Sequence, residues 1–86
     1  MKKETITFEC LEHNTNNGKM LCTLEIDSIA GVSYPTSKNN LKLVLLLKNL
    51  SPQPIAFIDL ESKEKAYQII MESIGAEVKL PELVEV

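Results

Sequence analysis

The two cysteines and the single histidine are the residues of this chain with the most versatile chemistry. Cys10, His13 and Cys22 lie close together in the sequence, and thiolate and imidazole are ligands that zinc prefers. Zinc sites usually draw on CxxC pairs or several histidines, and the chain has neither. Strand alternation also sends Cys10 and His13 to opposite faces. We therefore expect no metal site.

Catalysis by these residues is not expected either. An acid–base histidine needs a partner and a pocket, whereas His13 lies between Glu12 and Asn14 in a polar segment typical of a solvated turn. Cys10 and Cys22 belong to apolar strand faces, where burial raises the pKa of a thiol and suppresses its nucleophilic chemistry. These residues predict no nucleophile and no general base.

The remaining polar groups predict no active site. Glu9, Glu25 and Asp27 alternate with apolar residues, and we interpret them as an ordinary solvated strand face. The three glycines are scattered along the chain, so no loop of the phosphate-binding kind is present. We expect a protein without enzymatic activity, cofactor or small-molecule substrate.

Composition limits the location and the class of partner. The N-terminal sequence MKKETITF lacks the apolar stretch of a secretory signal, and the longest apolar run, residues 43–47, is far too short to span a membrane. We expect a cytoplasmic protein with reduced cysteines. A Cys10–Cys22 disulfide remains geometrically possible in one strand register.

The charged residues bear on the class of partner. All nine basic residues are lysine and the net charge is −3. This weakens the case for nucleic-acid binding, because arginine is the residue that forms bidentate hydrogen bonds to phosphates and bases.

The first half of the chain predicts a β-hairpin. Residues 5–12 and 19–34 alternate in polarity, and the apolar positions of both runs have even numbers. Opposed residues must share a face, so a two-residue Asn17-Gly18 turn is disfavoured. A loop of three residues or of five keeps the faces consistent, and the five-residue loop places Cys10 opposite Cys22. We expect a bend near Gly31 within the second strand.

The second half predicts two more strands and one helix. We expect strands at 41–48 and 55–60, an amphipathic helix at 63–74 with Ser62 as its N-cap and Gly75 closing it, and a short edge strand or extended tail at 76–86. A chain of 86 residues forms one domain, 1–86. The predicted fold class is α+β: an antiparallel sheet of four strands, or five with the tail, in the order β-β-β-β-α, with the helix packed on one face.

The strand at 41–48 raises a question of exposure because it is apolar on both faces. Its odd-numbered leucines form one stripe, which the helix can cover. On the opposite stripe Val44 and Leu46 lie between Lys42 and Lys48. If Ala56, Ile58 and Leu60 of the next strand face the helix, then four residues form one outer patch: Val44, Leu46, Ile55 and Phe57. Either the sheet curls so that the hairpin covers this patch, or another chain does.

The size of the patch favours a protein partner. Val44 and Leu46 alone would contribute about 3–6 kcal/mol if fully buried, against an association cost of about 4–15 kcal/mol. Four such residues from each subunit of a two-fold dimer could exceed that cost. We therefore predict a small protein-binding module, namely an adaptor, accessory subunit or stoichiometric inhibitor of the kind encoded by phages and mobile elements, that forms a homodimer. Lys42 and Lys48 would flank the interface.

The alternative function is binding of single-stranded nucleic acid. Proteins of this class stack bases on exposed aromatic residues and track the backbone with a cationic groove. Phe8, Tyr34 and Phe57 are the candidate aromatic residues. The candidate groove consists of Lys19, Lys38, Lys42 and Lys48. The acidic net charge and the absence of arginine and tryptophan count against this alternative.

Overall fold

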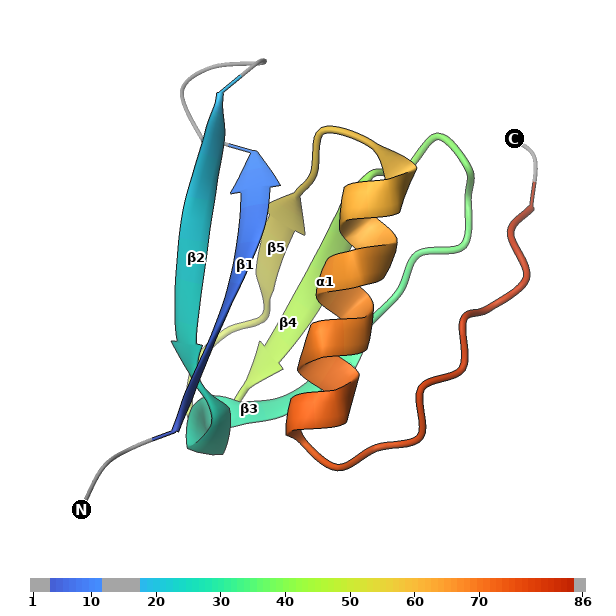
Figure 1. The fold of residues 1–86 in the computed structure, drawn as a ribbon. Coiled ribbons are helices and arrows are strands. Elements are labelled where there is room, and N and C mark those ends of the chain that lie inside the picture. The colour runs from blue at the N-terminus through green and yellow to red at the C-terminus, as the bar shows by residue number, and fades with distance from the viewer. Residues whose placement is uncertain (1–3, 12–17, 85–86) are drawn as a thin grey trace.

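The chain has an α+β fold, which confirms the predicted class, but its strands form two antiparallel sheets in place of one (Figure 1). The computed structural model describes residues 4–11 and 18–84. The elements, in chain order, are β1 (Thr5–Leu11), β2 (Lys19–Glu25), the 3-10 turn η1 (Ile26–Ser28), β3 (Ile29–Ser33), β4 (Lys42–Leu47), β5 (Gln53–Ala56) and the helix α1 (Leu60–Ser73). Within the described ranges, β1 and β2 form one sheet and β3, β4 and β5 form the other.

The hairpin of β1 and β2 keeps its apolar residues on one face. Phe8 opposes Cys22 and Cys10 opposes Met20, so even-numbered residues pair with even-numbered residues as predicted. The register that placed Cys10 opposite Cys22 was wrong, because the ladder ends at Leu11 and Lys19 and leaves a longer connection than five residues. The expected turn at Asn17 lies outside the described residues, as does the expected end of the first strand at residue 12.

The predicted strand 19–34 is divided by η1. The Ser28 hydroxyl donates a hydrogen bond to the carbonyl of Glu25 over 2.7 Å, a local bond of the kind that competes with strand pairing. The chain then leaves the hairpin, and β3 pairs with β4. The expected irregularity near Gly31 is present as a shift in register between Ile29 and Gly31, but the change of sheet occurs earlier, at η1.

The strand β4 is the centre of the second sheet. It pairs with β3 on one side and with β5 on the other, and Leu43 and Leu45 are fully buried. Ile55 of β5 opposes Leu43, so Ile55 points to the core. The ladder continues as the Phe57 N–H donates to the carbonyl of Leu41 over 2.7 Å. The strand predicted at 55–60 therefore begins two residues earlier, at Gln53, and ends at Ala56.

The helix begins one turn before its predicted start. Asp59 is the N-cap, because its side chain accepts a hydrogen bond from the Ser62 N–H over 2.8 Å. Ser62, the predicted N-cap, lies inside the first turn. Gly75 follows the helix with φ 76°, the left-handed conformation that glycine adopts most readily.

Residues 76–84 form an extended tail in place of an edge strand. Within this described segment the one strand-like contact is a parallel bridge between Val84 and Ser37. In the view of Figure 1 the tail passes α1 on the side opposite to the hairpin.

One hydrophobic core joins both sheets to the helix. The rings of Phe8 from β1 and Phe57, which follows β5, lie 6.2 Å apart. α1 contacts β1, β3 and β4 and contributes the buried residues Ala66, Tyr67 and Ile70. Of the helices in the described part of the chain, none is long and apolar enough to cross a membrane.

Candidate functional site

The face of the β3–β4–β5 sheet that points away from the core carries the residues predicted to bind a partner. Val44 opposes Ser33 and Pro54, Leu46 opposes Gly31, and Lys42 opposes Ala56. Opposed residues share a face. We call the following set the outer strip: Gly31, Ser33, Val44, Leu46, Pro54 and Ala56. Lys42 shares this face and is a charged residue at its end, while Leu46, near the centre, remains 41% exposed.

Four of the six predicted partner-binding residues lie at or beside the outer strip. Val44 and Leu46 are on the strip, half-buried and exposed respectively. Lys42 is exposed at one end of β4. Lys48 is exposed just after the other end, where its backbone N–H donates to the carbonyl of Ser28 over 2.9 Å. The two lysines therefore bracket the apolar centre of β4.

The other two predicted residues, Ile55 and Phe57, were assigned to the wrong face. Ile55 packs against the core, and Phe57 is only 2% exposed. The segment around them is apolar at every position from Ile55 to Ile58, so its alternation does not distinguish the faces. Packing does, because the large Ile55 and Phe57 fill the core, whereas the smaller Pro54 and Ala56 lie on the outer strip.

A second candidate is a cleft between the tip of the hairpin and the first turns of α1. It has a volume of about 400 Å³. Its apolar lining consists of Phe8, Ala66 and Ile69, and its polar lining of Glu9, Lys19, Asp59, Glu61, Ser62 and Lys65.

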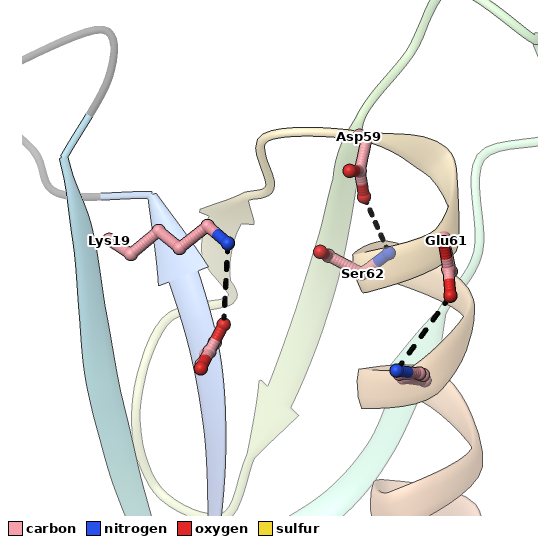
Figure 2. A network of polar contacts seen from close by, with 6 residues as sticks. Lys19, Asp59, Glu61 and Ser62 are labelled. Carbon is pink, nitrogen blue, oxygen red and sulfur yellow. Dashed lines mark hydrogen bonds and ion pairs between the residues drawn. The ribbon is translucent and has the colours of Figure 1, made fainter.

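Figure 2 shows how the charges at this cleft are arranged. Lys19 Nζ lies 3.9 Å from Glu9 Oε2, and Lys65 Nζ lies 3.8 Å from Glu61 Oε1. Exposed pairs of this kind contribute little to stability. The Ser62 N–H is the main cause that lowers the pKa of Asp59, with smaller contributions from Lys19 and Lys65. The charges therefore already have partners, and we assign no ligand to this cleft.

A buried lysine is the polar residue that the sequence analysis missed. Lys63 has no exposed surface. Its ammonium donates hydrogen bonds to the carbonyls of Pro35 over 2.8 Å and Asn40 over 2.5 Å, and it lies 4.2 Å from the centre of the Tyr34 ring. Burial lowers the pKa of Lys63. A signal existed in the sequence, because residue 63 shares the helical stripe of Ala66 and Ile70.

The three candidate aromatic residues lie in the core or pack against it. Phe8 and Phe57 are buried in the core, 4% and 2% exposed. Tyr34 is half-buried and contacts Tyr67 edge to face, with ring centroids 5.0 Å apart. Burial raises the pKa of Tyr34, and the neighbouring charge of Glu64 adds to this effect. Two of the three candidate aromatic residues are therefore core residues, and Tyr34 keeps part of its surface exposed.

The expectation that the cysteines are reduced differs from the structure, which pairs Cys10 with Cys22 in a disulfide. The two residues sit diagonally across the hairpin on its apolar face, with Cα atoms 6.6 Å apart, and Cys10 is 3% exposed. In the ranges that the structure describes, no cluster of His, Cys, Asp and Glu could hold a metal ion. His13 lies outside those ranges.

Comparison with known proteins adds no relative. The chain matches no family model, no curated protein and no solved structure.

Proposed function

We propose that this protein is a small non-enzymatic binding module that self-associates through the outer strip as a two-fold homodimer. The observation that carries this proposal is the position of Val44 and Leu46, which lie on a sheet face outside the core, with Leu46 41% exposed and the charged Lys42 at one end of that face. In this role the protein acts as an adaptor, accessory subunit or stoichiometric inhibitor, and phages and mobile elements are the expected source of such small modules.

A second copy of the chain suits this strip because of its shape and charge. Gly31, Pro54 and Ala56 are small beside Val44 and Leu46, so two strips can approach at the spacing of about 10 Å that separates stacked sheets. In a two-fold dimer the same patch meets itself. Lys42 and Lys48 remain in water at the rim, where such residues also discourage aggregation of the free chain.

The expected dimer is weak. A stable interface covers about 800 Å² on each partner, and Ile55 and Phe57 are buried in the core and add nothing to this one. We therefore expect a dissociation constant in the micromolar range or above, so that monomer and dimer exchange at ordinary concentrations.

Sedimentation over a range of concentrations tests this proposal. The wild type is expected to change from monomer to dimer as concentration rises, whereas Leu46→Glu stays monomeric because two carboxylates cannot be buried together without partners. Leu21→Glu is the matched control, since Leu21 is 69% exposed on β2, and it should behave as the wild type. A wild type that is monomeric throughout, or an equal effect of both substitutions, would reject the proposed dimer.

We further propose that the protein is cytoplasmic, which determines the expected redox state of Cys10 and Cys22. Cytosolic glutathione and thioredoxin keep thiols reduced, so Cys10 and Cys22 would be free in the cell and oxidised only after lysis. Trapping free thiols with a mass-tagged maleimide during lysis should then label both residues. Protein that resists labelling in this experiment would point to an oxidising compartment.

A further inference from the structure

The loop between β3 and β4 offers a short stretch of backbone to which an extended chain binds. The N–H of Lys38 donates to the carbonyl of Val84 over 3.0 Å, and the N–H of Val84 donates to the carbonyl of Thr36 over 2.8 Å. These two bonds form a parallel bridge centred on Ser37. We call residues 36–38 the strand seat. In this structure the strand seat is occupied by the chain's own tail.

Hydrogen bonds from Lys63 fix the backbone on both sides of the strand seat. The ammonium of Lys63 binds the carbonyl of Pro35 on one side of the seat and the carbonyl of Asn40 on the other. Within the loop, the Asn40 N–H donates to the carbonyl of Ser37 over 3.0 Å. Because Lys63 is fully buried and belongs to α1, these hydrogen bonds fix the loop to the helix through contacts that do not involve the tail.

The tail is a loosely attached occupant of the seat. In the part of the chain that the structure describes, no other backbone hydrogen bond joins residues 77–83 to the rest of the protein. Val84 is 57% exposed and Leu80 is 41% exposed. Pro81 and Leu83 are half-buried, so partial side-chain burial adds to these backbone hydrogen bonds. Contacts of this limited extent oppose the conformational entropy of the whole segment, and such a balance permits local opening without unfolding of the core.

We infer that the strand seat is a docking site for an extended segment of a partner protein, which binds parallel to residues 36–38 and displaces the tail. The tail shows the chemistry of the partner: an extended backbone whose N–H and carbonyl at one residue pair with Thr36 and Lys38, with a side chain at that position that stays largely in solvent, as that of Val84 does. Addition of a strand to exposed backbone is a common mode of peptide recognition. Lys63 is the positioning residue of this site, and the site is separate from the outer strip.

A peptide titration followed by NMR tests the site in the full chain. The probe is a peptide of residues 77–84, acetylated and amidated, and the reporter is the backbone amide of Lys38. Val84→Pro removes the N–H that binds Thr36 and so vacates the seat. We expect saturable shifts of the Lys38 amide in Val84→Pro at millimolar peptide, and at least tenfold weaker binding to wild type, where the tethered tail competes at a high effective concentration.

Three controls make the result specific. A probe peptide with proline in place of its last valine should leave Lys38 unchanged. Val78→Pro, which alters the tail where it makes no backbone hydrogen bond, should bind the probe as weakly as the wild type. Adding Lys63→Met to Val84→Pro should weaken binding at least tenfold while the amide of Leu45 in β4 keeps its position, which shows that the fold persists.

Two results would overturn the inference. One is a Lys38 amide that does not respond to the probe in Val84→Pro, or that responds equally to the proline peptide. The other requires no variant: amide hydrogen exchange of Val84 in the wild type should be much faster than that of Leu45, and equal rates would mean that the tail does not open.

Discussion

At the scale of single residues, Lys63 is the least expected feature of the molecule. A buried lysine is rare unless its ammonium has partners, and here two carbonyls and the face of Tyr34 supply them. Lys63 is three residues before Ala66 and seven before Ile70, so its place on the buried stripe follows from the sequence. Its carbonyl partners do not, because Pro35 and Asn40 become neighbours of α1 only in the folded chain.

Substitution of Lys63 by methionine should destabilise the protein. The methionine fills most of the volume but leaves the carbonyls of Pro35 and Asn40 without their donor, and we expect a loss of about 1–3 kcal/mol in the free energy of unfolding. Urea denaturation measures it. Lys65→Met is the matched control, because Lys65 is exposed on the same helix and should have little effect. Equal stabilities of the two variants would contradict the role of the buried ammonium.

Asp59 gives the helix a dependence on acid. Its folded-state pKa lies below the ordinary value of 3.8 because the carboxylate accepts the Ser62 N–H. The folded state therefore binds this proton more weakly than the unfolded state does. The stabilisation of the folded state by the Asp59 carboxylate is complete above pH 3.8 and is lost as the pH falls through the lower pKa of the folded state.

The variant Asp59→Asn tests whether Asp59 causes this loss of stability in acid, because it keeps an oxygen for the N-cap and removes the titrating carboxyl group. Thermal unfolding of the wild type should lose a component of stability below pH 3.8 that Asp59→Asn does not lose. Identical acid dependence of the two proteins would show that the cap does not carry the effect.

At the scale of elements, the disulfide stabilises the hairpin when the cysteines are oxidised. Cys10 and Cys22 are twelve residues apart, and closing a loop of that size in the unfolded chain is worth about 3 kcal/mol in the chain-entropy account. Denaturation with and without a reductant should show a loss of that order in the wild type. The double variant Cys10→Ala/Cys22→Ala is the control and should not respond to reductant. No difference in the wild type would mean that the bond does not constrain the unfolded chain.

Gly31 in the middle of β3 and Gly75 just after α1 differ in the backbone conformation and space that they require. Gly75 has φ 76°, where a side chain is strained, whereas a Cβ on Gly31 would meet Leu46 Cδ1 at 3.6 Å, an ordinary contact. We expect Gly75→Ala to lose about 1 kcal/mol and Gly31→Ala to lose nothing or gain about 0.5 kcal/mol. Chemical denaturation of both variants measures the contrast, and a larger loss at Gly31 would contradict it.

Alternation and spacing predicted these elements where one face is clearly apolar. β1 and α1 lie close to their expected positions for this reason. β4 also lies close to its expected position, although both of its faces are apolar, whereas β2 begins where expected and ends at Glu25, well before the expected end at residue 34. β5 was harder, because Ile55 to Ile58 is apolar throughout and the choice of face depends on packing with Leu43. The break at η1 depends on one local bond from Ser28, and a single bond of this kind leaves no periodic signal in the sequence.

At the scale of the whole molecule, one helix and two small sheets enclose a core, and the described residues leave the outer strip partly exposed. From the sequence, two covers were possible for the predicted patch of Val44, Leu46, Ile55 and Phe57: the chain's own hairpin, if the sheet curls, or a partner. The structure places half of that patch, Ile55 and Phe57, in the core. Val44 and Leu46 lie on the face of β4 that points away from the core. The partner-binding candidate is therefore smaller than predicted, and it is centred on β4.

The contact between two copies is tested most directly by NMR on a concentrated sample that mixes isotope-labelled and unlabelled protein. Filtered spectra of this sample report only contacts between copies. The two-fold dimer predicts such contacts among the methyl groups of Val44 and Leu46, and their loss in Leu46→Glu but not in Leu21→Glu. An absence of contacts between copies at the outer strip, or their presence only at another surface, would contradict the account.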